Sequence, residues 1–145
     1  PTNRHPNGAP MFNQLDDHVL VAPQVSPAQL AQARAEGVTM VVNNRPDGEE
    51  PGQPTSDELE AAARQAGLDY RHIPIARGMG PAEVEAMRQA LRDCTEGKLL
   101  AFCRTGTRSA LAWAVAKRQD GADRVELERG AEAAGYSLAP VSHLL

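Results

Sequence analysis

Short apolar runs alternate with amphipathic stretches along the chain, and this alternation predicts strands and helices in turn. Residues 38–42 form an apolar, largely β-branched run without a charge, which is typical of a strand buried on both faces of a sheet. Residues 81–94 have a helical pattern, because their apolar positions recur at spacings of three, four and three. Those positions are Val84, Met87, Leu91 and Cys94. Further short strands are predicted at 19–21, 70–75 and 99–102.

Capping motifs mark the starts of the predicted helices. Ser26 is followed by Pro27 and, three residues after the serine, by Gln29, which makes a capping box with proline at the first helical position. The same spacing of capping residues recurs at Thr55 and at Asp123. Glycines end the predicted helices at positions 37, 67 and 97 and near 135. Because strands and helices alternate, the sequence predicts a three-layer α/β fold with a central, mainly parallel sheet.

The chain divides into a short arm and one domain. Residues 1–11 contain three prolines and a glycine, and we interpret them as a flexible N-terminal arm. Residues 12–145 are then a single α/β catalytic domain, because a chain of 145 residues can bury one core.

Composition narrows the classes of partner. The net charge is −4, which argues against a nucleic-acid partner. No apolar run is long enough to span a membrane, and no export leader is visible. Two cysteines do not make a disulfide framework, so a cytoplasmic protein with reduced thiols is expected. The four histidines are scattered, and no metal site or cofactor is predicted.

The segment with the clearest chemistry is 103–109, Cys-Arg-Thr-Gly-Thr-Arg-Ser, which lies between a predicted strand and a predicted helix. Backbone N–H groups converge in such a loop, and the helix adds its positive N-terminal end, which together favour the thiolate form of a cysteine. Arg108 adds a planar cation that can hold an oxyanion on two donors. We therefore predict that Cys103 and Arg108 are catalytic. The predicted substrate-binding residues are Arg104, Thr105, Gly106, Thr107, Ser109 and Arg45.

Two further loops are expected at the same edge of the sheet, because sites in parallel sheets form beyond the carboxyl ends of the strands. The loop 43–54 is long and polar, and its Arg45 is expected to face the same anion as Arg108. Asp47 and Glu49 in that loop are candidate acids. The loop 76–80 contains an arginine among glycines but no carboxylate.

The spacing of the cysteine loop is similar to that of single-domain rhodaneses. Four residues separate Cys103 from Arg108, whereas the phosphatase loop of protein tyrosine phosphatases has five. Such a phosphatase would place arginine at position 109 and usually histidine at 102, where this chain has Ser109 and Phe102.

Four blocks of sequence, 41–49, 53–54, 70–75 and 102–109, together with Trp113, resemble one bacterial family. It is the beta-lactamase-hydrolase-like family, phosphatase-like domain, and the resemblance covers roughly residues 12–120. The resemblance implies a fold like that of dual-specificity and tyrosine phosphatases. It also implies Cys103 as nucleophile, the 104–108 backbone with Arg108 as anion cradle and Arg45 as accessory cation. Some family members are fused to a persulfide dioxygenase, which makes such an enzyme an implied functional partner.

Two chemistries compete for this site. A phosphatase acting through phosphocysteine needs an acid for its leaving group, which here could come only from Asp47 or Glu49. Sulfur transfer needs no such acid, because a thiolate leaves readily. We therefore favour a rhodanese-like sulfurtransferase that forms a persulfide on Cys103, with a small anionic or sulfane-sulfur substrate and a thiol acceptor. The phosphatase is the alternative, and an anion- or redox-sensing module without turnover is a third.

Overall fold

The computed structural model describes residues 12–145, so the predicted arm at 1–11 lies outside the described part of the chain. A five-stranded sheet forms the centre, in the order β1-β2-β5-β3-β4. All neighbouring strands are parallel except β1, which runs antiparallel to β2. The strands are β1 (Asn13–Gln14), β2 (Val19–Ala22), β3 (Val38–Asn43), β4 (Asp69–His72) and β5 (Lys98–Phe102).

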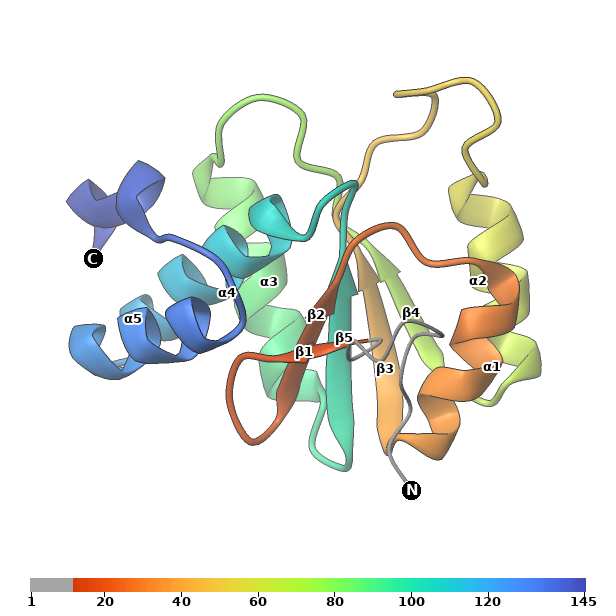
Figure 1. Cartoon of the computed structure of the whole chain (residues 1–145), viewed down its shortest axis with the longest axis horizontal. Coiled ribbons are helices and arrows are strands. Elements are labelled where there is room, and N and C mark those ends of the chain that lie inside the picture. The colour runs from red at the N-terminus through yellow and green to blue at the C-terminus, as the bar shows by residue number, and fades with distance from the viewer. Residues whose placement is uncertain (1–11) are drawn as a thin grey trace.

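Helices cover both faces of this sheet (Figure 1). On one side lie α1 (Pro27–Ala35) and α2 (Ser56–Gln65). On the other side lie α3 (Pro81–Asp93), α4 (Thr107–Gln119) and α5 (Arg124–Ala133), with the short 3-10 helix η1 (Ala139–Leu144) beyond them. The predicted three-layer α/β fold with a mainly parallel sheet is confirmed.

The central strand β5 shows how the core is divided between the two faces. Leu99 and Ala101 pack into the cluster that contains α3, α4 and α5, whereas Leu100 and Phe102 pack into the cluster with α1 and α2. Successive side chains of a strand point to opposite faces. Both faces of β5 are therefore buried from Leu99 onward, which is why residues 99–102 form an uninterrupted apolar run.

Capping motifs start the helices where the sequence places them. Ser26 and Thr55 each form a capping box, and the Asp123 carboxylate accepts the Glu126 backbone N–H at 3.2 Å. Helix α3 ends at Asp93, so Cys94 is its C-cap rather than a helical residue; it is half-buried and packs against the same core cluster as Val84 and Met87. Strand β1 and helix η1 were not predicted.

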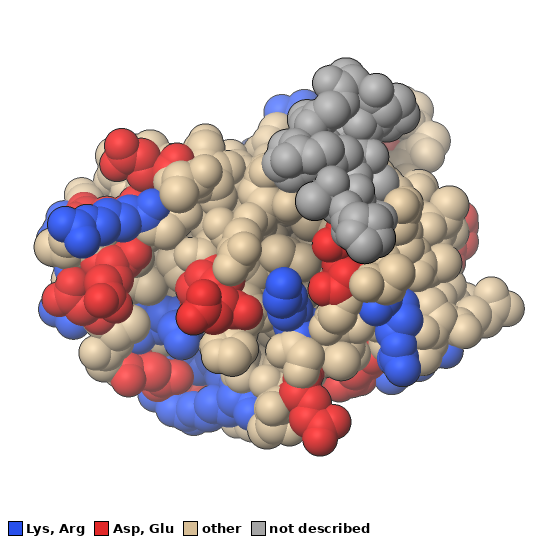
Figure 2. Space-filling view, turned by 60° about the horizontal axis from the view of Figure 1, so that its bottom comes forward, with Lys and Arg blue, Asp and Glu red and all other residues tan. Residues whose placement is uncertain are grey.

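The carboxyl ends of β3, β4 and β5 meet at one edge of the sheet, at the top of Figure 1. The opposite end of the molecule carries acidic and basic side chains that are interspersed (Figure 2). The loops that follow β3, β4 and β5 lie at the edge where the carboxyl ends of these strands meet, which is where sites form in parallel sheets.

Within residues 12–145, no helix is both long and apolar enough to cross a membrane.

Candidate active site

Cys103 lies directly after β5 and is fully buried. The backbone N–H of Gly106 donates to its sulfur at 3.1 Å. Gly106 is the residue before α4, with a φ of +92°, in the left-handed region that favours glycine. The sulfur is thus enclosed by a tight loop at the positive N-terminal end of a helix.

Tyr136 closes this loop from outside. Its hydroxyl donates to the Thr105 carbonyl at 3.0 Å. A Cβ atom at position 106 would overlap the Tyr136 hydroxyl, so glycine is required there for close approach as well as for its φ. Burial raises the pKa of Tyr136, and the nearby Cys103 charge adds to that shift. Tyr136 is not among the predicted site residues, because nothing in its sequence neighbourhood connects it with the cysteine loop.

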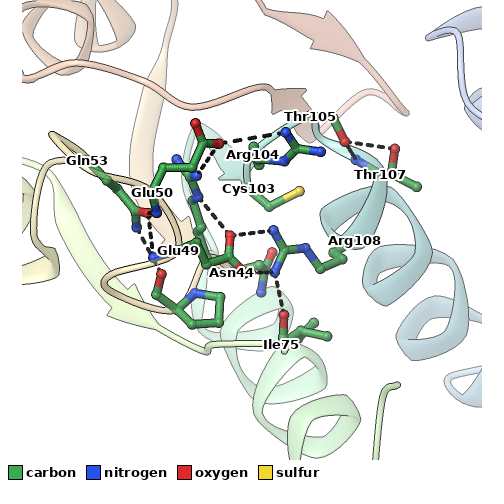
Figure 3. A network of polar contacts seen from close by, with 12 residues as sticks. Asn44, Glu49, Glu50, Gln53, Ile75, Cys103, Arg104, Thr105, Thr107 and Arg108 are labelled. Atoms are coloured by element: carbon green, nitrogen blue, oxygen red, sulfur yellow. Dashed lines mark hydrogen bonds and ion pairs between the residues drawn. The ribbon is translucent and has the colours of Figure 1, made fainter. Parts of the chain in front are cut away.

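Arg108 projects from the first turn of α4 towards the loop that follows β3 (Figure 3). Its Nη1 and Nη2 atoms donate to the two carboxylate oxygens of Glu49 at 2.7 and 2.9 Å. Nη1 also donates to the Ile75 carbonyl at 2.7 Å. The hydrogen bond to Glu49 and the charge of Cys103 both raise the pKa of Arg108. The guanidinium is therefore fixed from two loops and lies beside Cys103.

Glu49 is shared between two arginines. Arg45, which is 3% exposed, donates from Nε to a Glu49 carboxylate oxygen at 2.8 Å and from Nη2 to Glu50 at 2.8 Å. The hydrogen bond from Arg108 is the largest cause that lowers the pKa of Glu49 to about 2. Arg45 and Arg108 thus both contact Glu49, a carboxylate of the chain itself. That the two arginines face a substrate anion stays a prediction.

Ser109 and Asn44 tie the elements of the site together. The Ser109 hydroxyl donates to the Asn44 side-chain oxygen at 2.7 Å, and both residues are fully buried. The Asn44 side-chain nitrogen donates to the Ile73 carbonyl at 3.0 Å, and its backbone N–H to the Phe102 carbonyl at 2.8 Å. Ser109 was predicted to bind the anion, but its hydroxyl is engaged in this internal connection between α4 and the strands.

Three other predicted substrate-binding residues, Arg104, Thr105 and Thr107, have exposed side chains on the cysteine loop. The Arg104 side chain is 60% exposed, and its Nη1 atom lies 3.6 Å from a Glu50 oxygen. The Thr105 hydroxyl donates to that of Thr107 at 3.0 Å (Figure 3). These side chains are exposed to solvent, on the loop that follows the buried Cys103.

Both candidate acids are engaged as hydrogen-bond acceptors. The Asp47 carboxylate accepts the Ser56 backbone N–H at 2.8 Å, at the start of α2. Glu49 is held as a carboxylate by the two arginines. Residues 76–80 add no carboxylate. In this arrangement, neither predicted acid presents a proton to a leaving group. Within residues 12–145, no group of three or more metal-ligating side chains is placed to hold an ion.

The chain matches a known protein family over most of its length. Residues 11–122 match the family described as "Beta-lactamase hydrolase-like protein, phosphatase-like domain". A beta-lactamase hydrolase-like protein of Xylella fastidiosa is 34% identical over 126 residues, which is 86% of this chain and 29% of the relative. The chain thus spans less than a third of the length of that relative.

Solved structures show the same fold. A candidate phosphatase from Neisseria meningitidis is 36% identical and superposes with a TM-score of 0.77 over 91% of this chain and 94% of its own. Kinase associated phosphatase, solved with its catalytic cysteine replaced by serine, is 17% identical, with a TM-score of 0.62 over 83% of this chain and 79% of its own. The latter likeness concerns the fold alone. The predicted resemblance to the fold of dual-specificity and tyrosine phosphatases is confirmed.

Proposed function

The chain belongs to the phosphatase-like domain family of beta-lactamase hydrolase-like proteins, and on that premise we propose that it is a cysteine-dependent phosphatase. The Cys103 thiolate attacks the phosphorus of a phosphate monoester, a P–S bond forms, and the P–O bond to the leaving group breaks. Water then hydrolyses the phosphocysteine and releases inorganic phosphate. Family membership and the 36% identical candidate phosphatase favour this reaction over the sulfur transfer that the loop spacing had suggested.

The observation that carries the proposal is the pairing of a buried Cys103 with an arginine beside it. Arginine has five N–H donors, and Arg108 uses three of them, two for Glu49 and one for Ile75. Besides the hydrogen bond to Glu49, one to the Cys103 side chain also raises the pKa of Arg108, so the guanidinium reaches the sulfur. The donors on Nε and Nη2 that Glu49 does not use can bind phosphoryl oxygens when substrate is present. Glu49 is then a positioning residue for Arg108.

Charge stabilisation comes from groups already oriented before substrate binds. The N-terminus of α4 and the Gly106 N–H lie at the sulfur, so negative charge that develops on the phosphoryl group meets fixed dipoles and the Arg108 cation. Such preorganised donors need little rearrangement in the transition state. The missing element is a proton donor, so substrates whose leaving oxygen departs without a proton, such as aryl phosphates, are expected to react best.

Hydrolysis of an aryl phosphate tests the proposal. We expect phosphate release by the wild-type chain and none above background by Cys103→Ser. Cys94→Ser is the matched control, because this second thiol lies half-buried at the end of α3, next to Thr39, and we expect it to keep wild-type activity. Absence of phosphate release from the folded wild-type chain would contradict the proposal.

Sulfur transfer stays a second candidate, favoured by the four-residue spacing of the loop and by the lack of a proton donor. In that reaction, the Cys103 thiolate attacks the sulfane sulfur of thiosulfate, the S–S bond breaks and sulfite leaves. A thiol acceptor then takes the outer sulfur of the persulfide. A Cys103-dependent release of sulfite from thiosulfate, without hydrolysis of aryl phosphate, would support this candidate.

A further inference from the structure

Two carbonyl groups of the cysteine loop are held by segments that lie far away in the sequence. The Arg104 carbonyl accepts the backbone N–H of Gln24 at 3.2 Å, and the Thr105 carbonyl accepts the Tyr136 hydroxyl at 3.0 Å. The first contact is made by backbone alone and does not depend on the identity of a side chain. The second depends on the phenol of one residue, so removing a single oxygen atom abolishes it.

The peptide group between Thr105 and Gly106 connects Tyr136 with the sulfur of Cys103. A trans peptide is planar, so its C=O and N–H bonds point in opposite directions. In this peptide, the carbonyl faces the Tyr136 hydroxyl, and the N–H donates to the Cys103 sulfur at 3.1 Å. The hydroxyl on the outside of the loop therefore fixes the direction of the N–H on the inside.

This peptide is free to turn unless another group holds it. Gly106 has no Cβ, which leaves little steric hindrance to rotation of the peptide that precedes it. A turned peptide would present the Thr105 carbonyl oxygen to the sulfur in place of the N–H, and the partial negative charge of that oxygen would repel an anion. The hydrogen bond from Tyr136 favours the orientation in which a donor faces the sulfur.

Tyr136 itself is placed by the end of helix α5. The N–H of Gly135 donates to the Glu132 carbonyl at 3.0 Å. The N–H of Tyr136 donates to the Ala131 carbonyl at 2.8 Å. These two hydrogen bonds form the Schellman motif that commonly ends a helix. Burial raises the pKa of Tyr136, so its hydroxyl keeps its proton and is a donor at neutral pH.

We propose that Tyr136 is a positioning residue for the reaction at Cys103, because it holds the Thr105–Gly106 peptide with its N–H towards the sulfur. The inference rests on the proposed phosphatase function and adds a residue to it. When water hydrolyses the phosphocysteine, the P–S bond breaks and its electron pair returns to the sulfur. The Gly106 N–H faces that charge as it develops, so its orientation affects the rate of this step.

The supporting contact comes from outside the part of the chain that matches the family. The match ends at residue 122, whereas α5 begins at Arg124 and Tyr136 follows this helix. The cysteine loop lies entirely within the matched region. A change after residue 122 is therefore expected to alter the reaction at Cys103 through the orientation of one peptide group.

The variant Tyr136→Phe tests the inference, because it removes one hydroxyl and keeps the ring. We would record the NMR signal of the Gly106 amide in the folded variant and in wild type, and measure kcat and KM for an aryl phosphate. The amide proton is expected to move upfield, since its hydrogen bond to the sulfur weakens while the neighbouring ring is retained. We expect kcat to fall about tenfold and KM to change less than about twofold, because the bond acts on charge that develops during the reaction.

The variant Tyr70→Phe is the matched control, because it makes the same chemical change away from the cysteine loop. The Tyr70 hydroxyl is hydrogen-bonded to Asn43 at 3.0 Å and to Ser56 at 2.8 Å. Its loss is expected to lower stability and to leave the Gly106 signal in place.

An unchanged Gly106 signal in Tyr136→Phe, an unchanged kcat, or an equal displacement of that signal in the two variants would overturn the inference. Failure of the phosphatase proposal would show separately, as absence of turnover in the wild-type chain. In that case, the Gly106 signal alone decides whether Tyr136 positions the peptide.

Discussion

The two loops that meet at Cys103 are held in different ways. The loop after β5 is closed mainly by its own backbone, because Gly106 donates to the Cys103 sulfur three residues away. The loop after β3 is fastened by charges, since Glu49 pairs with Arg108 at a separation of 59 residues. The first loop therefore keeps its shape by local geometry, whereas the second is joined to the first by ion pairs in addition to its own hydrogen bonds, such as that from Gln53 to the Pro46 carbonyl.

The largest expected effect follows from removing the cation that joins the two loops. Arg108→Ala is expected to lower kcat/KM for an aryl phosphate by about 10²–10⁴, because two charge-assisted hydrogen bonds of roughly 1.5–3 kcal/mol each are lost. Arg108→Lys is expected to recover part of this, since a point charge cannot reproduce the fork. Arg104→Ala, at a mostly exposed side chain, is the control and should change kcat/KM only a few-fold. Near-wild-type activity of Arg108→Lys would contradict the claim that Arg108 binds the phosphoryl group through two donors at once.

A substitution at Gly106 tests whether the cysteine loop depends on local geometry. Gly106→Ala imposes a strained φ on alanine and places its methyl group against the Tyr136 hydroxyl. We expect a loss of about 1–3 kcal/mol in the free energy of unfolding and loss of most phosphatase activity. Gly121→Ala is the matched control, because Gly121 has a φ of +98° and no atom within 4 Å of an added Cβ.

The control should show the backbone strain alone, with activity retained. In a Tyr136→Phe background, the harm done by Gly106→Ala should become smaller, because the overlapping hydroxyl is absent. Urea unfolding and steady-state kinetics on the four variants measure both effects. Equal losses of activity in Gly106→Ala and Gly121→Ala would contradict the account of the loop.

Glu49→Gln tests whether the second loop positions Arg108 for catalysis. The substitution keeps the shape of the side chain but removes its charge, so Arg108 loses its charge-assisted partner. We expect kcat/KM to fall about tenfold, with a smaller change in the Glu50→Gln control, whose carboxylate contacts Arg45 and Arg104. A rise in kcat/KM would mean that Glu49 instead competes with substrate for Arg108.

The smallest effect expected is a pH dependence of stability. The pKa of Glu49 is lowered from 4.5 to about 2 in the folded chain. The stability of wild type relative to Glu49→Gln should be complete above about pH 4.5 and shrink as the pH falls towards 2, because the unfolded chain takes up a proton first. Urea unfolding of both proteins at several pH values measures this difference. A difference that stays constant down to about pH 3 would contradict the ion pair.

The sequence was sufficient for the features that depend on near neighbours. The alternation of strands and helices, the capping boxes at Ser26 and Thr55, and the position of Cys103 between a strand and a helix all follow from local pattern. Strand β1 escaped prediction because two residues cannot show a period. The ion pair between Glu49 and Arg108 could not be predicted either, because a loop carboxylate can be an acid or a counter-ion. Only the fold brings Arg108 within reach of Glu49.

Tyr136 illustrates a further limit. It contacts the cysteine loop from a segment far along the chain and does not stand in a recognisable motif. Its contact depends on how the segment after α5 packs beside α4, which is a tertiary property. The choice between phosphate and sulfur chemistry does not follow from loop spacing alone, because the family and the 36% identical relative favour the phosphatase, which was the alternative prediction.

The central claim is that Cys103 forms a covalent bond to phosphorus. The most direct measurement is intact-mass spectrometry of the wild-type chain quenched in acid during turnover of an aryl phosphate, beside a sample incubated with thiosulfate. The account predicts an added phosphoryl group in the first sample that maps to Cys103 and is absent in Cys103→Ser. An added sulfur atom on Cys103 in the second sample, with no phosphoryl adduct in the first, would contradict it.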